Sequence, residues 1–381
     1  MRTITFTTIL AFAGTAIACT STGADHKESA PVDVVCDGEQ TQAADSIYTD
    51  DTEDDDFSRV ITIALTGDIM MGTTYPDTVL PANSGRSLFN DVRSVLRDAD
   101  LAVGNLEGTL CDSGQTKKTK VAYNYAFRTP TSFAPRLSEA GFDFLSMANN
   151  HSNDFGWTGI RSTEQALTRN GILFAGIKGR RRMTVINRNG VRIGVCAFGH
   201  NSFTLKIQDL PTVKSVLDSL RKTSDIIVVS VHGGGEGTAY SHLPYGKEEY
   251  IGEDRGSLRS FARFCIDNGA DVIYGHGPHV VRCVEMYKDR FIAYSLGNFC
   301  TPYGINTTGI SGYAPVIEVR TDDKGRFIEG QIHSFIQKRG LGPRRDPTDI
   351  VARHIRSLTL TDIVNPHLTI TDKGKIKRIN Q

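Results

Sequence analysis

The sequence of 381 residues lacks the short motifs by which several classes of protein are identified. It has no CxxC pair, which argues against a zinc site built from cysteine thiolates. The GxGxxG and Walker signatures of nucleotide-binding loops are absent, and so is any nucleic-acid-binding motif or internal repeat. Only 13 prolines, with 39% hydrophobic and 23% charged residues, indicate a globular protein rather than a disordered or collagen-like chain.

Positive charge is nearly missing from one stretch of the chain. Residues 20–58 carry twelve Asp and Glu against the single Lys27, so the net charge of zero hides an uneven distribution. Residues 59–381 contain 41 Lys and Arg against 31 Asp and Glu, a net charge of +10. Such a surplus draws anionic substrates or a polyanion to the surface, but scattered solvated lysines give the same count.

The chain also lacks an apolar run long enough to span a bilayer as a helix. Arg2 precedes an apolar segment from Ile4 to Ile17, shorter than the roughly 20 residues that a spanning helix needs. We interpret residues 1–18 as a signal peptide. Ala16-Ile17-Ala18-Cys19 resembles a bacterial lipobox, which predicts a lipid anchor at Cys19; the alternative is an ordinary leader cut near Ala18. We expect residues 19–58 to form a disordered acidic tether.

The remaining chain alternates predicted strands and helices. Strands are expected over 60–65, 101–103, 142–147, 191–198, 226–231 and 272–274, and helices over 86–97, 133–140, 159–170, 213–222 and 258–268. This alternation predicts an α/β domain over 59–340. Antiparallel strands are expected at 280–286, 291–295, 316–320 and 327–335. Residues 341–381 are expected to form a C-terminal helix, at 346–358, and a tail with a frayed basic end at 373–378.

Polar clusters follow five of the predicted strands. In an open α/β sheet such loops converge on one edge, where ligands bind. Histidine, asparagine and carboxylate side chains together suit a borderline divalent metal. Any one of these histidines could instead be a structural, hydrogen-bonded residue, but their convergence favours a metal site. The clusters are Gly67-Asp68; Asn105 with Glu107; Asn149-Asn150-His151 with Asp154; His232 with Glu236; and His276 with His279.

Five motifs in order over about residues 60–300 resemble the CapA-type family of poly-gamma-glutamate capsule synthesis proteins. The motifs are Thr66 to Gly72, Gly104 to Glu107, Asn149 to Gly156, Gly275 to Val280 and Tyr294 to Phe299. The resemblance implies a calcineurin-like metallophosphoesterase fold, a β-sandwich flanked by helices with its site at strand ends. It changes the expectation from one doubly wound sheet to two facing sheets, followed by an antiparallel C-terminal part.

The resemblance also implies a set of metal ligands for a divalent ion of the Mn, Fe or Zn class. Metallophosphoesterases have Asp-x-His where this chain has Asp68-Ile69-Met70, and Asn105 lacks the charge of a bridging carboxylate. One metal, or a bridge through Glu107, is therefore as plausible as a two-metal site. The implied ligands are Asp68, Asn105 or Glu107, Asn150, His151, His232, His276 and His279.

Three residues are expected to take part in proton transfer. His151 could act as a general acid or base, with Asp154 orienting its ring. The alternative for Asp154 is an N-cap of the following helix. Glu236 is the third candidate. Asn298, by contrast, is expected to satisfy backbone groups in a turn.

Two hypotheses for function follow. The first is an exported, lipid-anchored, metal-dependent hydrolase or transferase of the cell envelope, acting on an anionic polymer or a phosphoester. The second is a catalytically degenerate component that binds a polyanion during export or attachment of the polymer. Other capsule synthesis or export proteins are expected partners, and nucleic acid is not.

Overall fold

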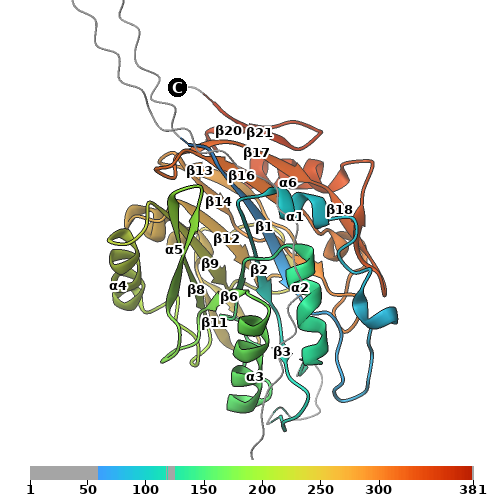
Figure 1. The fold of residues 1–381 in the computed structure, drawn as a ribbon. Coiled ribbons are helices and arrows are strands. Elements are labelled where there is room, and N and C mark those ends of the chain that lie inside the picture. Colours follow the sequence, from blue (N-terminus) through green and yellow to red (C-terminus); the bar gives the residue numbers. More distant parts are fainter. Residues whose placement is uncertain (1–58, 117, 119–124, 380–381) are drawn as a thin grey trace, which may run out of the picture. The chain divides into compact units, whose positions relative to one another are not determined.

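The computed structural model describes residues 59–116, 118 and 125–379. Two β-sheets lie face to face at its centre, with helices on the outer face of each (Figure 1). The two-sheet arrangement flanked by helices confirms the expected fold class. The predicted signal peptide, Cys19 and the acidic tether lie outside the described residues.

The larger sheet contains a parallel part and an antiparallel part. β1, β2, β5 and β6 run parallel, whereas β16, β17, β21 and β20 extend the sheet from β1 by antiparallel pairing. β15 pairs with the end of β1 in parallel. The strands are β1 (Ile61–Ile69), β2 (Leu101–Leu106), β5 (Phe144–Ser146), β6 (Leu173–Ala175), β15 (Asn298–Cys300), β16 (Val316–Thr321), β17 (Phe327–His333), β20 (Leu368–Ile370) and β21 (Lys375–Arg378).

The smaller sheet has the order β13-β14-β12-β9-β8-β7, and β8, β9, β12 and β14 are parallel. Its strands are β7 (Met183–Arg188), β8 (Val191–Gly199), β9 (Ile226–His232), β12 (Val272–His276), β13 (Val284–Tyr287) and β14 (Arg290–Ala293). Three two-stranded sheets pair β3 (Thr109–Leu110) with β4 (Arg128–Thr129), β10 (Glu248–Tyr250) with β11 (Glu253–Gly256), and β18 (Phe335–Lys338) with β19 (Gly342–Arg345).

Helices cover the outer faces of both sheets. α1 to α3 share a buried apolar cluster with one face of the larger sheet, and α4 and α5 pack on the smaller sheet. α6 contacts β13 and β17. The helices are α1 (Arg93–Asp98), α2 (Ala134–Ala140), α3 (Gly156–Arg169), α4 (Leu210–Arg221), α5 (Leu258–Asp267) and α6 (Ile350–Asp362).

The sequence of β1 explains which of its residues point to each side of the larger sheet. Successive residues of a strand point to opposite sides. Ile61, Ile63 and Leu65 belong to the cluster between the sheets, whereas Ala64 belongs to the cluster under α1 to α3. A strand that is buried on both faces is rich in apolar residues, as the first half of β1 is.

Three expected elements differ from the structure. In 86–97 only the last turns are helical, because α1 begins at Arg93. The strand expected from Val280 begins at Val284, since the preceding residues follow the loop that carries His279. The basic end is not frayed: Lys375–Arg378 forms β21, which is fixed between β17 and β20.

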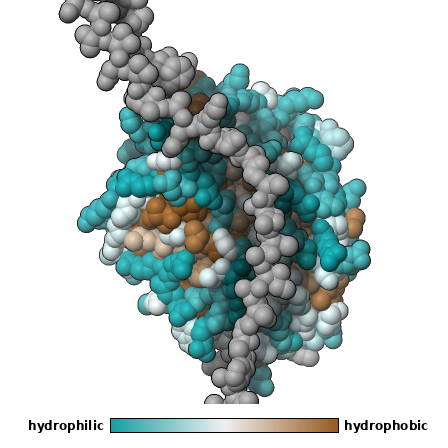
Figure 2. All heavy atoms as spheres, viewed as in Figure 1, coloured by the Kyte–Doolittle hydropathy of each residue, from teal (hydrophilic) through white to brown (hydrophobic). Residues whose placement is uncertain are grey.

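The surface in this view is largely hydrophilic, with apolar side chains gathered in a few places (Figure 2). Among the described residues no helix has the length and apolar character required to cross a membrane. The five cysteines in the described ranges are buried and free.

Candidate functional site

Asp68 lies near the end of β1, where strand register places an amide on each side of it. β1 pairs with β2 so that Asp68 is opposite Asn105, and with β15 so that Asp68 is opposite Asn298. Both pairings shift register beside Asp68, and such irregularities re-aim side chains. All three side chains are fully buried, so their polar atoms need partners within the protein.

Asn149 fixes the orientation of the amide network. Its Nδ2 donates to the main-chain oxygen of Leu106 at 2.8 Å, and its Oδ1 accepts from the main-chain nitrogen of His151 at 3.0 Å. These two main-chain partners determine which amide atom is which. Nδ2 also donates to Asn105 Oδ1 at 2.9 Å. The oxygen of Asn105 is therefore directed toward Asn149.

Asn105 consequently presents its nitrogen to two carboxylates. Its Nδ2 donates to Asp68 Oδ1 at 2.8 Å and to Glu107 Oε2 at 2.5 Å. An amide nitrogen is a donor and does not bind a cation. Metal ligation by Asn105 stays a prediction, and in this structure the residue links the two carboxylates.

Glu107 is completely buried, and burial raises its pKa to about 7, with the nearby charge of Asp68 adding to the effect. Its Oε1 has no hydrogen-bond partner. Oε2 lies 3.3 Å from His232 Nε2. Glu107 therefore has an oxygen free to accept a cation or a proton.

His232 and His276 end two neighbouring strands of the smaller sheet, opposite each other in register. Both are fully buried, and burial lowers the pKa of each to about 3, so the rings are neutral at neutral pH. Both nitrogens of His232 and Nδ1 of His276 lack hydrogen-bond partners, while His276 Nε2 contacts Ser230 Oγ at 2.6 Å. Neutral imidazole with a free nitrogen is the form that binds metals.

His279 connects this region to Asp68. Its backbone has a φ of 59°, in the left-handed region that is uncommon for residues with a side chain. Its Nδ1 is 3.0 Å from Asp68 Oδ2 and 3.1 Å from Asn298 Oδ1. Asn298 donates to main-chain oxygens through Nδ2, as expected, but it begins strand β15 rather than lying in a turn. Its Oδ1 also orients His279.

Asp68 and His279 form a charged pair. Burial by itself lowers the pKa of His279, but the hydrogen bond and charge of Asp68 outweigh it and raise the pKa to about 9. Burial likewise opposes ionisation of Asp68, yet the hydrogen bond from His279 and the neighbouring histidines keep its pKa below the ordinary value.

His151 and Asp154 form a second pair. Asp154 Oδ2 is 2.9 Å from His151 Nδ1 and accepts from the main-chain nitrogen of Phe127 at 2.7 Å. Asp154 Oδ1 lies 2.5 Å from Lys118 Nζ. Helix α3 begins at Gly156 without a side-chain cap, so the N-cap alternative for Asp154 is wrong. Asp154 holds the ring of His151 and leaves Nε2 available for proton transfer.

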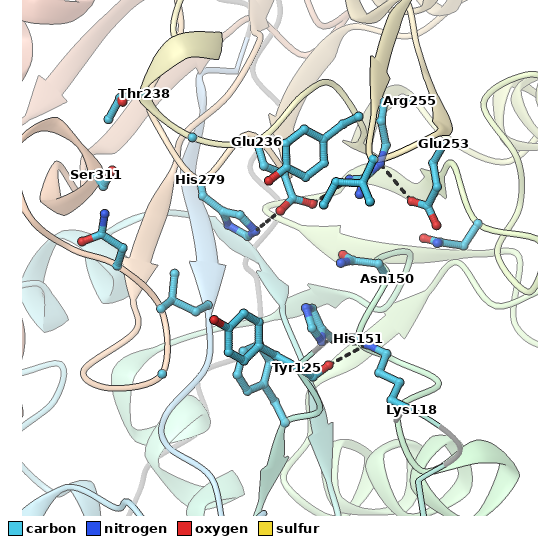
Figure 3. Close-up of a pocket in the computed structure, with 18 of the residues that line it drawn as sticks. Lys118, Tyr125, Asn150, His151, Glu236, Thr238, Glu253, Arg255, His279 and Ser311 are labelled. Carbon is cyan, nitrogen blue, oxygen red and sulfur yellow. Dashed lines mark hydrogen bonds and ion pairs between the residues drawn. The ribbon is translucent and has the colours of Figure 1, made fainter. Parts of the chain in front are cut away.

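His151 and His279, with Asn150 and Glu236, line a cavity of about 820 Å³. The fully buried Asp68, Glu107, His232 and His276 are not part of its lining. Lys118, His151 and Tyr125 lie on one side of it, and His279, Glu236 and Arg255 on the other (Figure 3). Glu236 Oε1 accepts from Arg255 Nη1 at 2.7 Å, and Glu236 Oε2 is 3.9 Å from His279 Nε2. Burial opposes ionisation of Glu236, but the charges of His279 and Arg255 lower its pKa overall.

The donor atoms fit a divalent cation in type, although they are not gathered into a complete coordination shell. Among the residues that the structure describes, no three His, Cys, Asp or Glu side chains are placed to hold a metal ion together. In this structure Asp68 Oδ1 accepts a hydrogen bond from Asn105, and Asp68 Oδ2 is paired with His279. The fit rests on buried polar atoms without hydrogen-bond partners, which are Glu107 Oε1, Asn150 Oδ1, His232 Nδ1 and Nε2, and His276 Nδ1.

Several residues of this region were not predicted from the sequence. Asn149 belongs to a predicted cluster, but no role was assigned to it. His200 follows β8 and stacks on His232 with ring centroids 5.5 Å apart, so the strand-end rule could have found it. Lys118 and Arg255 belong to no strand-end motif, and only the folded chain brings them to the cavity.

The sequence was compared with known proteins. Residues 62–303 match the family described as bacterial capsule synthesis protein PGA_cap. The chain belongs to this family. It is 28% identical to the capsule biosynthesis protein CapA of Bacillus anthracis, over 73% of this chain and 68% of that protein. It is 29% identical to the PGA biosynthesis protein CapA of Bacillus subtilis, over 70% of each chain.

Solved structures resemble this PGA_cap family member only partly. A hypothetical protein from Thermus thermophilus is 15% identical, with a TM-score of 0.44 over 72% of this chain and 99% of that one. A putative 5'-nucleotidase from Staphylococcus aureus is 14% identical, with a TM-score of 0.42 over 72% of this chain and 53% of that one. Similarity at this level carries no argument about activity.

Proposed function

We propose that this protein is a divalent-metal-dependent hydrolase or transferase that acts on poly-gamma-glutamate or another anionic polymer of the bacterial envelope. The observation that carries the proposal is the set of buried polar atoms without partners at the strand ends of both sheets, beside a large cavity. Buried polar groups are normally hydrogen-bonded, and a bound cation would account for this group of exceptions. Two relatives named for capsule or PGA biosynthesis support the choice of polymer.

The residues that would hold the ion are Asp68, Glu107, Asn150, His232 and His276, with His151 and His279 as further candidates. When bound, an ion of the Mn, Fe or Zn class polarises a carbonyl or phosphoryl oxygen.

The protein's own side chains supply the remaining chemistry. His151 can give or take a proton at Nε2, because Asp154 fixes its ring through Nδ1. Lys118 compensates the charge of buried Asp154. Glu236 stays ionised because its pKa is lowered, which makes it a weak base and suits it to hold Arg255 and face His279.

A second candidate function is that of a polyanion-binding component without catalysis. It is favoured by the absence of three converging metal ligands in the described ranges and by Met70, whose sulfur accepts from the main-chain nitrogen of Gly72 where metallophosphoesterases place a histidine ligand. The basic charge of residues 59–381 would serve this function equally well.

Turnover separates the two candidates. The full mature chain, supplied with Mn²⁺ or Zn²⁺, is assayed on phosphoester and glutamyl-amide substrates. We expect the parent to turn over one of these classes and His151→Gln to be about 10²–10⁴-fold slower. His333→Gln, at a histidine outside the cavity lining, is the matched control. If the parent binds the polymer but turns over nothing, the binding component replaces the enzyme.

We further propose that the protein is attached to the envelope by a lipid on Cys19, with residues 20–58 as the tether. Both parts lie outside the described residues, and the leader sequence supports the proposal. Cys19→Ala should release the protein from membranes without changing the fold of the body. Equal retention of parent and variant on fractionation would contradict the lipid anchor.

A further inference from the structure

The β10–β11 hairpin forms one wall of the cavity and is anchored by buried ion pairs. Glu248, at the start of β10, accepts from Arg282 Nη1 at 2.9 Å and Nη2 at 2.6 Å, and both side chains are almost completely buried. Glu248 Oε1 also accepts from the main-chain nitrogen of Gly235 at 3.0 Å. The base of the hairpin is thus tied to the loop between His232 and Glu236.

Arg255 supplies a second anchor. The register between β10 and β11 shifts so that Glu249 faces Asp254 and Glu248 faces Gly256, which leaves Arg255 as the extra residue of a bulge. A bulge re-aims the side chain that it carries. The Arg255 side chain is 5% exposed and binds Glu236 at the cavity wall (Figure 3).

The tip of this anchored hairpin is a two-residue loop with an unusual residue. Ile251 and Gly252 both have positive φ, 48° and 71°, and join paired residues Tyr250 and Glu253. Such loops favour Asn-Gly, because asparagine tolerates the left-handed region and a β-branched residue is strained there.

The β7–β8 hairpin uses the expected residues, whereas the β13–β14 hairpin turns through Lys288 and Asp289, both with positive φ. Asn189 and Gly190 join β7 to β8 with φ values of 54° and 80°, in a two-residue loop between paired Arg188 and Val191. Asn189 is not part of the cavity lining, whereas Ile251 is, with 66% of its surface exposed. Strained residues that persist in a structure are concentrated at ligand sites.

We propose that Ile251 is a specificity-determining residue, which contacts the hydrocarbon part of an anionic polymer chain bound in the cavity. The proposal rests on the proposed function and deepens it by naming a residue that recognises the polymer. Tyr125, Phe203 and Ile251 give the cavity apolar surface, and Lys118 contributes positive charge. A polyglutamate chain matches this mixture, because every unit carries one carboxylate and two methylene groups.

Binding of two polymers to the full mature chain tests the proposal. Poly-gamma-glutamate carries methylene groups, and inorganic polyphosphate carries charge alone. Ile251→Asn should weaken binding of poly-gamma-glutamate by about fivefold, the loss of roughly one apolar contact, and leave binding of polyphosphate within about twofold of the parent. Its melting temperature should equal or exceed that of the parent, because asparagine relieves the strain.

Two controls accompany this variant. Val364→Asn removes an exposed apolar side chain away from the cavity lining and should leave both affinities unchanged. Asn189→Ile places the strained residue in the other hairpin, and should lower the melting temperature without changing either affinity.

The outcomes separate this proposal from the proposed function. If Ile251→Asn binds both polymers as the parent does, or loses affinity for both equally, Ile251 does not determine specificity for the polymer. The proposed function would still stand. A lower melting temperature for Ile251→Asn would contradict the strain argument. If the parent does not bind poly-gamma-glutamate, the polymer assigned in the proposed function is wrong and the role of Ile251 falls with it.

Discussion

The two sheets contribute different kinds of side chain to the site. On the larger sheet, Asp68, Asn105 and Asn149 form a continuous network in which the amide atoms are used within the protein. On the smaller sheet, His232 and His276 are equally buried, yet three of their four ring nitrogens have no hydrogen-bond partner.

The larger-sheet residues of the site therefore serve mainly stability, and the smaller-sheet histidines serve mainly the proposed function. Hydrogen bonds of the larger-sheet network stabilise the fold, because every member would be left unsatisfied without the others. Neutral histidines without hydrogen-bond partners contribute little to the fold, and the metal that we propose would account for their burial. Substitutions on the larger-sheet side should therefore mainly lower stability, and substitutions on the smaller-sheet side should mainly lower metal binding.

The largest expected effect is on the larger-sheet side. Asp68→Ala removes the acceptor of Asn105 Nδ2 and the counter-charge of His279. The loss should lower the free energy of unfolding of the chelator-treated protein by about 3–5 kcal/mol. Denaturant titration measures it, with exposed Asp77→Ala as a control that should stay within about 0.5 kcal/mol. A change below about 1 kcal/mol for Asp68→Ala would mean that the network does not stabilise the fold.

The pH dependence of stability should also differ between the two sides. The pKa of His279 rises from 6.5 to about 9 on folding, so its contribution is complete below pH 6.5 and is lost as the pH rises through 9. His232 and His276 have pKa values lowered from 6.5 to about 3, so their contribution is present above pH 6.5 and is lost as the pH falls toward 3.

The His279→Gln variant tests the loss of stability that is expected as the pH rises through 9. In metal-free protein the stability difference between parent and His279→Gln should be largest below pH 6.5 and small above pH 9, as measured by thermal unfolding across this range. A stability difference that did not vary with pH would contradict the expected role of His279. So would the same pH dependence of stability for the His333→Gln variant.

The smallest effect is expected on the smaller-sheet side. His232→Leu replaces a buried ring that has no hydrogen bonds by an apolar side chain of similar volume. The free energy of unfolding of metal-free protein should change by less than about 1.5 kcal/mol, in either direction. Denaturant titration of the same pair of proteins checks this. A loss as large as that of Asp68→Ala would show that His232 has a partner in solution.

Much of the fold follows from the sequence alone. The apolar run of β1, the parallel strands and the polar strand ends are local patterns, so Asp68, Asn105, His232 and His276 could be expected at one edge. The family resemblance added the second sheet. The helix expected from residue 86 failed in its first part, because apolar spacing alone does not show where a helix begins.

The rest of the site depends on tertiary contacts that no local pattern contains. The orientation of the Asn105 amide follows from Asn149, 44 residues later in the chain. Arg255 reaches Glu236 because of a bulge, and Lys118 reaches Asp154 across 36 residues of sequence. β21 is ordered by pairing with β17, although its own sequence is short and basic.

The most direct test of the account is the metal content of the full mature chain after equilibrium dialysis against Mn²⁺ or Zn²⁺. The parent should retain metal in stoichiometric amount. His232→Leu should retain little of it while folding as well as the parent, and His333→Leu should retain as much as the parent. A parent chain without stoichiometric metal, or a His232→Leu variant that binds as much metal as the parent, would contradict the proposed metal site.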